Sequence, residues 1–142
     1  MKARIPEISV LIPSYNHAAW VVEAVQSVLV QKGVGFEIVV VDDGSSDDSV
    51  DRLRAIQDPR LSLIVQENRG LSRALNRALA AARGKWVKFL PSDDLLLPGC
   101  LQAQAAEVEG CVAVFCRPEV VDGALRPLSC PKTDWRQNLR RK

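Results

Sequence analysis

The chain has 142 residues and a net charge of +2; 47% of the residues are apolar and 25% are charged. This length and composition predict one globular domain with its own core and exclude a disordered chain. No apolar run approaches the roughly 18 residues of a membrane span, and residues 1–7 lack the apolar segment of a signal peptide. The expected location is the cytoplasm, with the inner face of the membrane as the alternative.

Charge is distributed unevenly along the chain. Residues 132–142 hold five basic side chains and one acidic one, whereas the rest of the chain has a net charge of −2. Nothing in the balance of the main part indicates nucleic-acid binding. The tail is expected to be a solvated end, and the alternative is contact with anionic lipid or nucleic acid.

Apolar segments rich in β-branched residues alternate with segments of helical periodicity. In chain order, strands are expected at 8–12, ended by Pro13, and at 36–41, 61–65, 86–90 and 111–116. The helices between them are expected to present apolar faces made by Val21, Val25, Val28 and Leu29, by Val50, Leu53 and Ile56, by Leu71, Leu75, Ala78, Leu79 and Ala82, and by Leu101, Ala105 and Val108.

This order of elements predicts an α/β fold, with a mostly parallel, doubly wound sheet covered by helices on both faces. After residue 116, Asp122 and Gly123 are typical of a hairpin turn, which would add antiparallel strands at one edge. The pattern fades from Pro127. We therefore expect one domain over residues 1–130 and a basic tail over 131–142.

Polar side chains follow three of the predicted strands, at 13–16, 42–44 and 92–94. Ligands of open α/β sheets bind outside the carboxyl ends of the strands, where these segments would meet. One Asp-Asp pair alone could cap a helix. Two pairs, Asp42-Asp43 and Asp93-Asp94, each close behind an apolar strand, favour a ligand site. Such carboxylates suit either a hard divalent cation or the donor groups of a base and ribose.

The glycine loops that commonly bind phosphate are missing, because the sequence contains neither G-x-x-x-x-G-K-[ST] nor G-x-G-x-x-G. Arg69, Arg73 and Arg77 instead form a basic stripe on the third helix. The first two lie near the start of that helix, where its dipole disfavours cations unless an anion is nearby. For Arg77 a solvated basic face is an equal alternative.

In order and spacing, these segments resemble family 2 glycosyltransferases of GT-A fold. The similarity covers residues 7 to about 125 and is carried by the segments SVLIPSYN (9–16), VDDGSSD (41–47), ENRG (67–70), ALN (74–76), ARG (82–84) and FLPSDD (89–94). Two positions depart from the family's usual pattern. Pro91 replaces a frequent acidic residue, and Leu75 replaces a frequent arginine.

On the nucleoside side, the resemblance implies that Pro13 and Tyr15 line the pocket and that Tyr15 lays its ring against the base. Asn16 would support that loop. Asp43 would accept hydrogen bonds from the base, typically uracil in this family, and Asp42 would order the loop.

On the diphosphate side, Asp93 and Asp94 match the acidic pair of the DXD motif. By resemblance, Asp93 lies near the ribose and Asp94 binds a Mg²⁺ or Mn²⁺ that bridges the diphosphate. Gly70 would let the backbone approach the donor, and Arg73 would be a phosphate neighbour.

The reaction that the resemblance implies is metal-dependent transfer of a sugar, with inversion, from a nucleotide-diphospho-sugar to an acceptor hydroxyl. The expected donor is a UDP-sugar, the acceptor is an unidentified glycan or lipid-linked molecule, and the usual setting is polysaccharide biosynthesis. No catalytic base can be assigned, because the family's acceptor half would follow this segment. The alternative is a nucleotide- and metal-binding module that needs another segment for turnover. A receiver-like phosphoacceptor domain is disfavoured, since it gives Asp93 and Asp94 no role.

Overall fold

The computed structural model describes residues 5–111, 113–114, 119, 121–122 and 124–126, and this part of the chain forms a four-stranded parallel sheet. Its strands are β1 (Ile8–Ser14), β2 (Phe36–Asp42), β3 (Leu61–Val65) and β4 (Trp86–Phe89), in the order β3-β2-β1-β4. The helices that alternate with them are α1 (Val21–Leu29), α2 (Ser49–Arg54), α3 (Leu71–Ala81) and α4 (Cys100–Glu107). The predicted parallel α/β sheet is thus confirmed.

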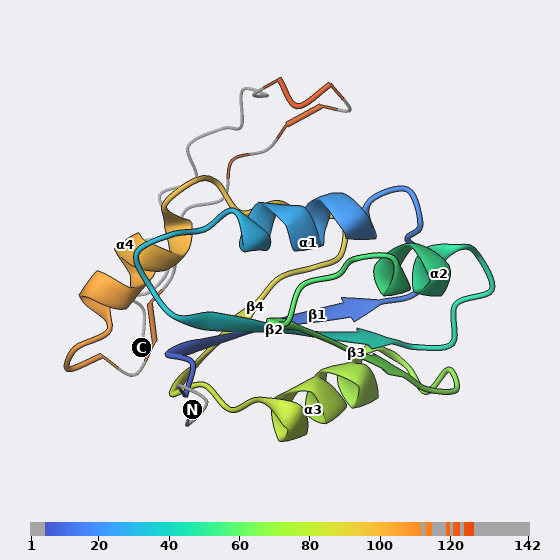
Figure 1. Ribbon diagram of the computed structural model, residues 1–142, viewed down its shortest axis with the longest axis horizontal. Coiled ribbons are helices and arrows are strands. Elements are labelled where there is room, and N and C mark those ends of the chain that lie inside the picture. Colours follow the sequence, from blue (N-terminus) through green and yellow to red (C-terminus); the bar gives the residue numbers. More distant parts are fainter. Residues whose placement is uncertain (1–4, 112, 115–118, 120, 123, 127–142) are drawn as a thin grey trace, which may run out of the picture.

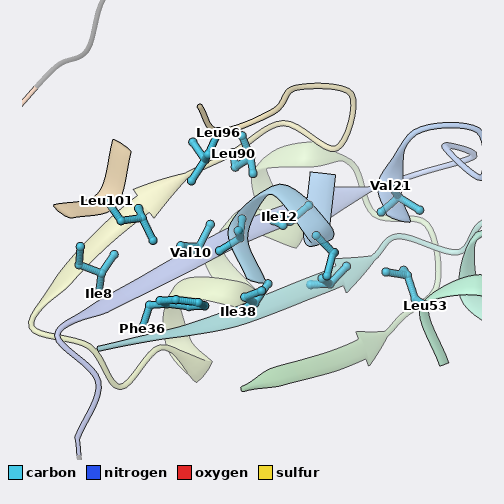
Figure 2. Close-up of a cluster of buried hydrophobic side chains, with 13 residues drawn as sticks. Ile8, Val10, Ile12, Val21, Phe36, Ile38, Leu53, Leu90, Leu96 and Leu101 are labelled. Atoms are coloured by element: carbon cyan, nitrogen blue, oxygen red, sulfur yellow. The ribbon is translucent and has the colours of Figure 1, made fainter. Parts of the chain in front are cut away.

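Helices cover both faces of the sheet, as the apolar strands predicted. Figure 1 shows α1, α2 and α4 on one face and α3 on the other. Because successive side chains of a strand point to opposite faces, β1 sends Val10 and Ile12 toward α1, and Leu11 toward α3. The larger cluster, on the α1 face, includes Ile38, Leu53 and Leu101 (Figure 2).

The first strand does not end at Pro13 as expected. It continues to Ser14, with Pro13 opposite Val41 and Ser14 opposite Asp42. Proline removes one backbone donor but keeps its extended φ, and the ladder is continued by the Ser14 carbonyl, which accepts from the Asp43 amide at 2.8 Å. The extra residues carry the β1 and β2 ends to the same edge.

The apolar face predicted for α3 is only partly correct. Ala74 and Ala78 are the buried residues of this helix, whereas Leu71 and Leu79 are 63% and 49% exposed. Alanine side chains allow a close approach of the helix to the sheet, and the larger leucines are left beside the contact. This rotation turns Leu71 toward a cavity described below.

After α4, the described residues agree less well with the predicted fifth strand and hairpin. Cys111, Ala113 and Val114 are not in a strand, and the other residues of the expected fifth strand lie outside the described residues. At the expected hairpin, the Asp122 amide donates to the Arg126 carbonyl at 3.0 Å, which forms a turn. Gly123 and the basic tail lie outside the described residues. Among the described helices, none has the length and apolarity to cross a membrane.

Candidate functional site

A cavity of about 640 Å³ opens at the carboxyl edge of the sheet. Its walls come from the loop after β1, the end of β2, the start of α3 and the turn after β4. Five residues predicted for the site line it: Pro13, Tyr15, Asp43, Gly70 and Asp93. The parallel topology therefore brings together side chains that are up to 80 residues apart.

Four other predicted site residues do not line this cavity: Asn16, Asp42, Arg73 and Asp94. Asp94 is exposed directly beside Asp93, and Arg73 is exposed on the first turn of α3. Asn16 belongs to the loop after β1, and Asp42 is the last residue of β2. For these two the structure gives hydrogen bonds that order the loops.

Asp43 is almost completely buried, with 4% of its surface exposed, yet its carboxylate is well satisfied. Oδ1 accepts from Gln66 Nε2 at 2.6 Å and from the Arg69 amide at 2.9 Å, and Oδ2 accepts from the Gly70 amide at 2.7 Å. Burial alone would raise the pKa of Asp43. The three hydrogen bonds together lower the pKa by more than burial raises it, so the pKa lies below its ordinary value. The cavity thus contains a fixed negative charge at neutral pH.

Gln66 is a site residue that the sequence analysis missed. It directly follows β3, and its backbone amide donates to the Asp42 carbonyl at 3.0 Å. Arg77 Nη1 donates to Gln66 Oε1 at 3.3 Å, which turns the Gln66 NH₂ group toward Asp43. Its position at a strand end was the available signal, but a single glutamine has no diagnostic spacing. Arg77 is exposed, as the alternative of a solvated basic face predicted, and its guanidinium also orients this amide.

The loops after β1 and β2 are tied together through Asp42 and Asn16. The Asp42 carboxylate accepts from the Ser45 amide and hydroxyl at 2.8 and 2.6 Å, and the Ser45 hydroxyl in turn accepts from the Asn16 amide at 2.8 Å. Asn16 has a φ of 53°, a left-handed conformation that asparagine tolerates. Its Oδ1 accepts from the Ser46 amide at 2.8 Å. These bonds hold Tyr15, which is 46% exposed, at the cavity mouth.

The acidic pair lies on a turn after β4. The Asp94 amide donates to the Pro91 carbonyl at 3.1 Å, and both Asp93 and Asp94 are exposed. Within the described part of the chain, no three His, Cys, Asp or Glu side chains gather to hold a metal. A cation at this turn would therefore complete its shell with ligand and water oxygens, as Mg²⁺ sites with one or two carboxylates do.

Ser14 and Ser92 are buried hydroxyls whose residues border the cavity. Ser92 Oγ is hydrogen-bonded to His17 Nδ1 at 2.6 Å. Ser14 Oγ is buried and has no partner within the described residues. Such a group is uncommon in folded proteins, and an incoming ligand or water is the usual partner.

An open parallel sheet with a cavity and a buried ionised carboxylate at its carboxyl edge defines a ligand-binding α/β domain. The sequence model of glycosyl transferase family 2 matches residues 9–137. The chain belongs to that family.

Relatives of known name are longer than this chain. The succinoglycan biosynthesis protein ExoO of Rhizobium meliloti is 42% identical over 100 residues, which are 70% of this chain and 29% of ExoO. Chondroitin synthase of Escherichia coli is 35% identical over 118 residues, which are 80% of this chain and 17% of the synthase. The chain thus spans less than a third of the length of either relative.

Solved structures similar to this one include two glycosyltransferases with bound donors. TarS residues 1–349 of S. aureus in complex with UDP-GlcNAc are 30% identical, with a TM-score of 0.68 over 73% of this chain and 31% of that chain. The mannosyltransferase PcManGT from Pyrobaculum calidifontis, in complex with GDP-Man and Mn²⁺, is 31% identical, with a TM-score of 0.64 over 73% of this chain and 32% of that chain. The expected GT-A fold is confirmed by these neighbours.

Proposed function

We propose that this domain binds a nucleotide-diphospho-sugar, with a UDP-sugar as the expected donor, and forms the donor half of an inverting, metal-dependent glycosyltransferase. The observation that carries the proposal is one cavity lined by the ionised Asp43, by Asp93 of the acidic pair and by the half-exposed ring of Tyr15. The UDP-GlcNAc complex of TarS supports a sugar nucleotide as the ligand.

In this proposal Asp43 recognises the base. A carboxylate has about four lone-pair sites, and protein donors already occupy three of those of Asp43. One site remains for a donor from the cavity, which fits the single imide N–H of uracil. The exposed Tyr15 ring and Pro13 offer an apolar surface for the flat face of the base.

The acidic pair would hold the cation. Asp93 and Asp94 are exposed carboxylates at a strand end, and such oxygen donors suit Mg²⁺ or Mn²⁺ shared with phosphate oxygens. When bound, the cation would neutralise charge on the departing nucleoside diphosphate. The protein's own part is to fix the base at Asp43 and present the two carboxylates on the turn after β4.

The test is calorimetric titration of UDP into the purified chain, first with Mn²⁺ and then with excess chelator. We expect Mn²⁺ to tighten UDP binding, and we expect Asp94→Asn to remove this tightening. Asp51→Asn is the matched control, because Asp51 is an equally exposed carboxylate on α2 whose ion pair with Arg54 is on the surface. Unchanged Mn²⁺ dependence in Asp94→Asn would overturn the metal assignment. GDP and dTDP, titrated in parallel, test the choice of base.

A second candidate is a module that binds nucleotide and metal but does not turn over alone. The observation that favours it is the coverage, since the chain matches less than a third of ExoO and of chondroitin synthase. The acceptor, and a base that deprotonates its hydroxyl, have no assigned residues in the described part of the chain. Release of UDP from a UDP-sugar in the presence of Mn²⁺ would distinguish the two, because the module alone would bind the donor without releasing UDP.

A further inference from the structure

His17 connects two segments of the cavity wall, the loop after β1 and the turn after β4. It follows Asn16 in the loop after β1, it lines the cavity, and its Nδ1 is hydrogen-bonded to Ser92 Oγ at 2.6 Å. Ser92 is 3% exposed and directly precedes the acidic pair. One of the two groups donates and the other accepts, so the contact satisfies both.

Other contacts also hold His17. The His17 backbone amide donates to Ser49 Oγ at 3.1 Å, and the His17 ring packs edge to face against Trp20, with ring centroids 5.3 Å apart. The next amide, of Ala18, donates to Asp47 Oδ2 at 2.9 Å. His17 is therefore fixed by the loops that form the nucleoside end of the cavity.

The turn that carries the acidic pair has few attachments of its own. The Leu90 amide donates to the Leu11 carbonyl at 3.0 Å before the turn, and the Leu96 amide donates to Ser27 Oγ at 3.0 Å after it. Between these two points, the described residues attach the turn to the rest of the domain by one side-chain hydrogen bond, between Ser92 Oγ and His17 Nδ1. The positions of Asp93 and Asp94 consequently depend on this bond.

We propose that His17 is a positioning residue that couples the nucleoside pocket to the acidic pair, so that nucleotide and divalent cation strengthen each other's binding. This inference rests on the proposed function. A nucleotide that contacts the loop after β1 would restrict His17 further and, through Ser92, would restrict the turn after β4. The cation would then bind to two carboxylates that are already in place. Its affinity would therefore be higher in the presence of the nucleotide, and by linkage the affinity for the nucleotide would be higher in the presence of the cation.

The experiment compares the Kd of UDP in excess chelator with its Kd in saturating Mn²⁺, and the ratio of the two measures the coupling. In His17→Ala we expect this ratio to fall by about fivefold or more, the order of one lost hydrogen bond. The Kd in chelator should stay within about twofold, since the contacts proposed for the base are unchanged. Ser92→Ala should lower the ratio equally, and the double variant should lower it no further, because both remove the same bond.

Two further variants separate positioning from a general structural role. In His17→Asn an amide atom takes nearly the place of Nδ1, so this variant should recover much of the coupling. Ser9→Ala removes a buried hydroxyl bond to Glu37 at the opposite edge of the sheet; it should lower the melting temperature and leave the ratio unchanged. Should His17→Ala fail to fold, Ser92→Ala decides the matter.

The outcomes distinguish the two proposals. A wild-type ratio well above one that persists in both His17→Ala and Ser92→Ala overturns the role of His17 and leaves the proposed function standing. A wild-type ratio of one with UDP bound overturns the coupling and the metal dependence of the proposed function, but leaves nucleotide binding standing. No binding of UDP, GDP or dTDP in either condition overturns the proposed function together with the inference.

Discussion

Replacing Glu37 with glutamine should destabilise the domain at neutral pH and much less in acid. Glu37 lies near the start of β2 and is 4% exposed. Its Oε1 accepts from Ser9 Oγ at 2.7 Å and from the Arg83 amide at 2.6 Å. Its Oε2 accepts from Arg83 Nε at 2.7 Å and forms an ion pair with Arg83 Nη2 at 2.6 Å. These bonds attach the connection between α3 and β4 to the centre of the sheet.

The magnitude follows from which bonds survive. In Glu37→Gln the amide oxygen can keep the Ser9 and Arg83 backbone donors, but the NH₂ group faces the guanidinium, so the hydrogen bond from Arg83 Nε and the ion pair with Nη2 are lost. Hydrogen bonds to charged groups contribute about 1.5–3 kcal/mol each, whereas the Arg83 side chain is 64% exposed and its pair is largely screened. We expect a net loss of about 2 kcal/mol, or roughly 4–8 °C in Tm for a chain of this size.

The dependence on pH has a definite sign. Burial raises the pKa of Glu37, and the hydrogen bonds from Ser9 and Arg83 together with the Arg83 charge lower the pKa by more, leaving it below its ordinary value. A carboxylate with a lowered folded-state pKa stabilises the protein above its unfolded pKa, about 4.3 for glutamate. That stabilisation is lost as the pH falls through the folded-state pKa. The difference between wild type and variant should therefore shrink in acid.

The assay is urea unfolding of wild type and Glu37→Gln at pH 7 and at steps down to about pH 3, followed by circular dichroism. Other carboxylates titrate in the same range, but they are common to both proteins and cancel in the difference. A difference in unfolding free energy that is the same at every pH, or is absent at pH 7, would refute the reasoning.

Three further substitutions test separate parts of the structure. Val40→Asp places a charge at a fully buried position of β2. Burying an unpaired charge costs several kcal/mol, and the whole free energy of unfolding of a domain is about 5–15 kcal/mol, so we expect an unfolded chain. A cooperative melt near that of wild type would contradict the core assignment. In Gly44→Ala, a residue with a φ of 77° would also place its Cβ only 2.8 Å from the Asn68 amide nitrogen. We therefore expect the substitution to displace the segment before α3. Calorimetry should show UDP binding weakened about tenfold, which corresponds to about 1.4 kcal/mol. Ser14→Ala removes the buried hydroxyl without a partner in the described residues and should raise the unfolding free energy by about 1 kcal/mol; a lower melting temperature would mean that the hydroxyl is satisfied in solution.

The sequence was sufficient to locate the edge of the sheet where the site lies. Apolar runs predicted five strands, and four of them form in the described part of the chain. Parallel strands bring their carboxyl ends together, so the residues at the ends of β1, β2 and β4 had to converge. This is why Pro13, Asp43 and Asp93 line one cavity. Local pattern and topology suffice for such a prediction because neither depends on detailed packing.

Contacts between distant residues were not predictable in the same way. The bond from His17 to Ser92 spans 75 positions, and that from Gln66 to Asp43 spans 23. Each depends on strand register and loop conformation, which a pattern of residue types does not determine. The prediction of the apolar face of α3 was only partly correct for a related reason. Periodicity alone cannot tell whether Ala78 or the larger Leu79 makes the close contact with the sheet.

The two edges of the sheet show how a structural carboxylate differs from one available to a ligand. Glu37, at the amino edge, accepts three hydrogen bonds from Ser9 and Arg83, forms an ion pair with Arg83 Nη2, and does not line the cavity. Asp43, at the carboxyl edge, accepts three and borders a cavity. Asp93 and Asp94 accept none from the described residues. A buried charge is costly unless hydrogen bonds or an ion pair compensate it, and both Glu37 and Asp43 are compensated in this way. Burial alone therefore does not distinguish a structural carboxylate from a ligand-binding one. Access to the cavity, rather than burial, is what favours Asp43 and the acidic pair as ligand-binding groups.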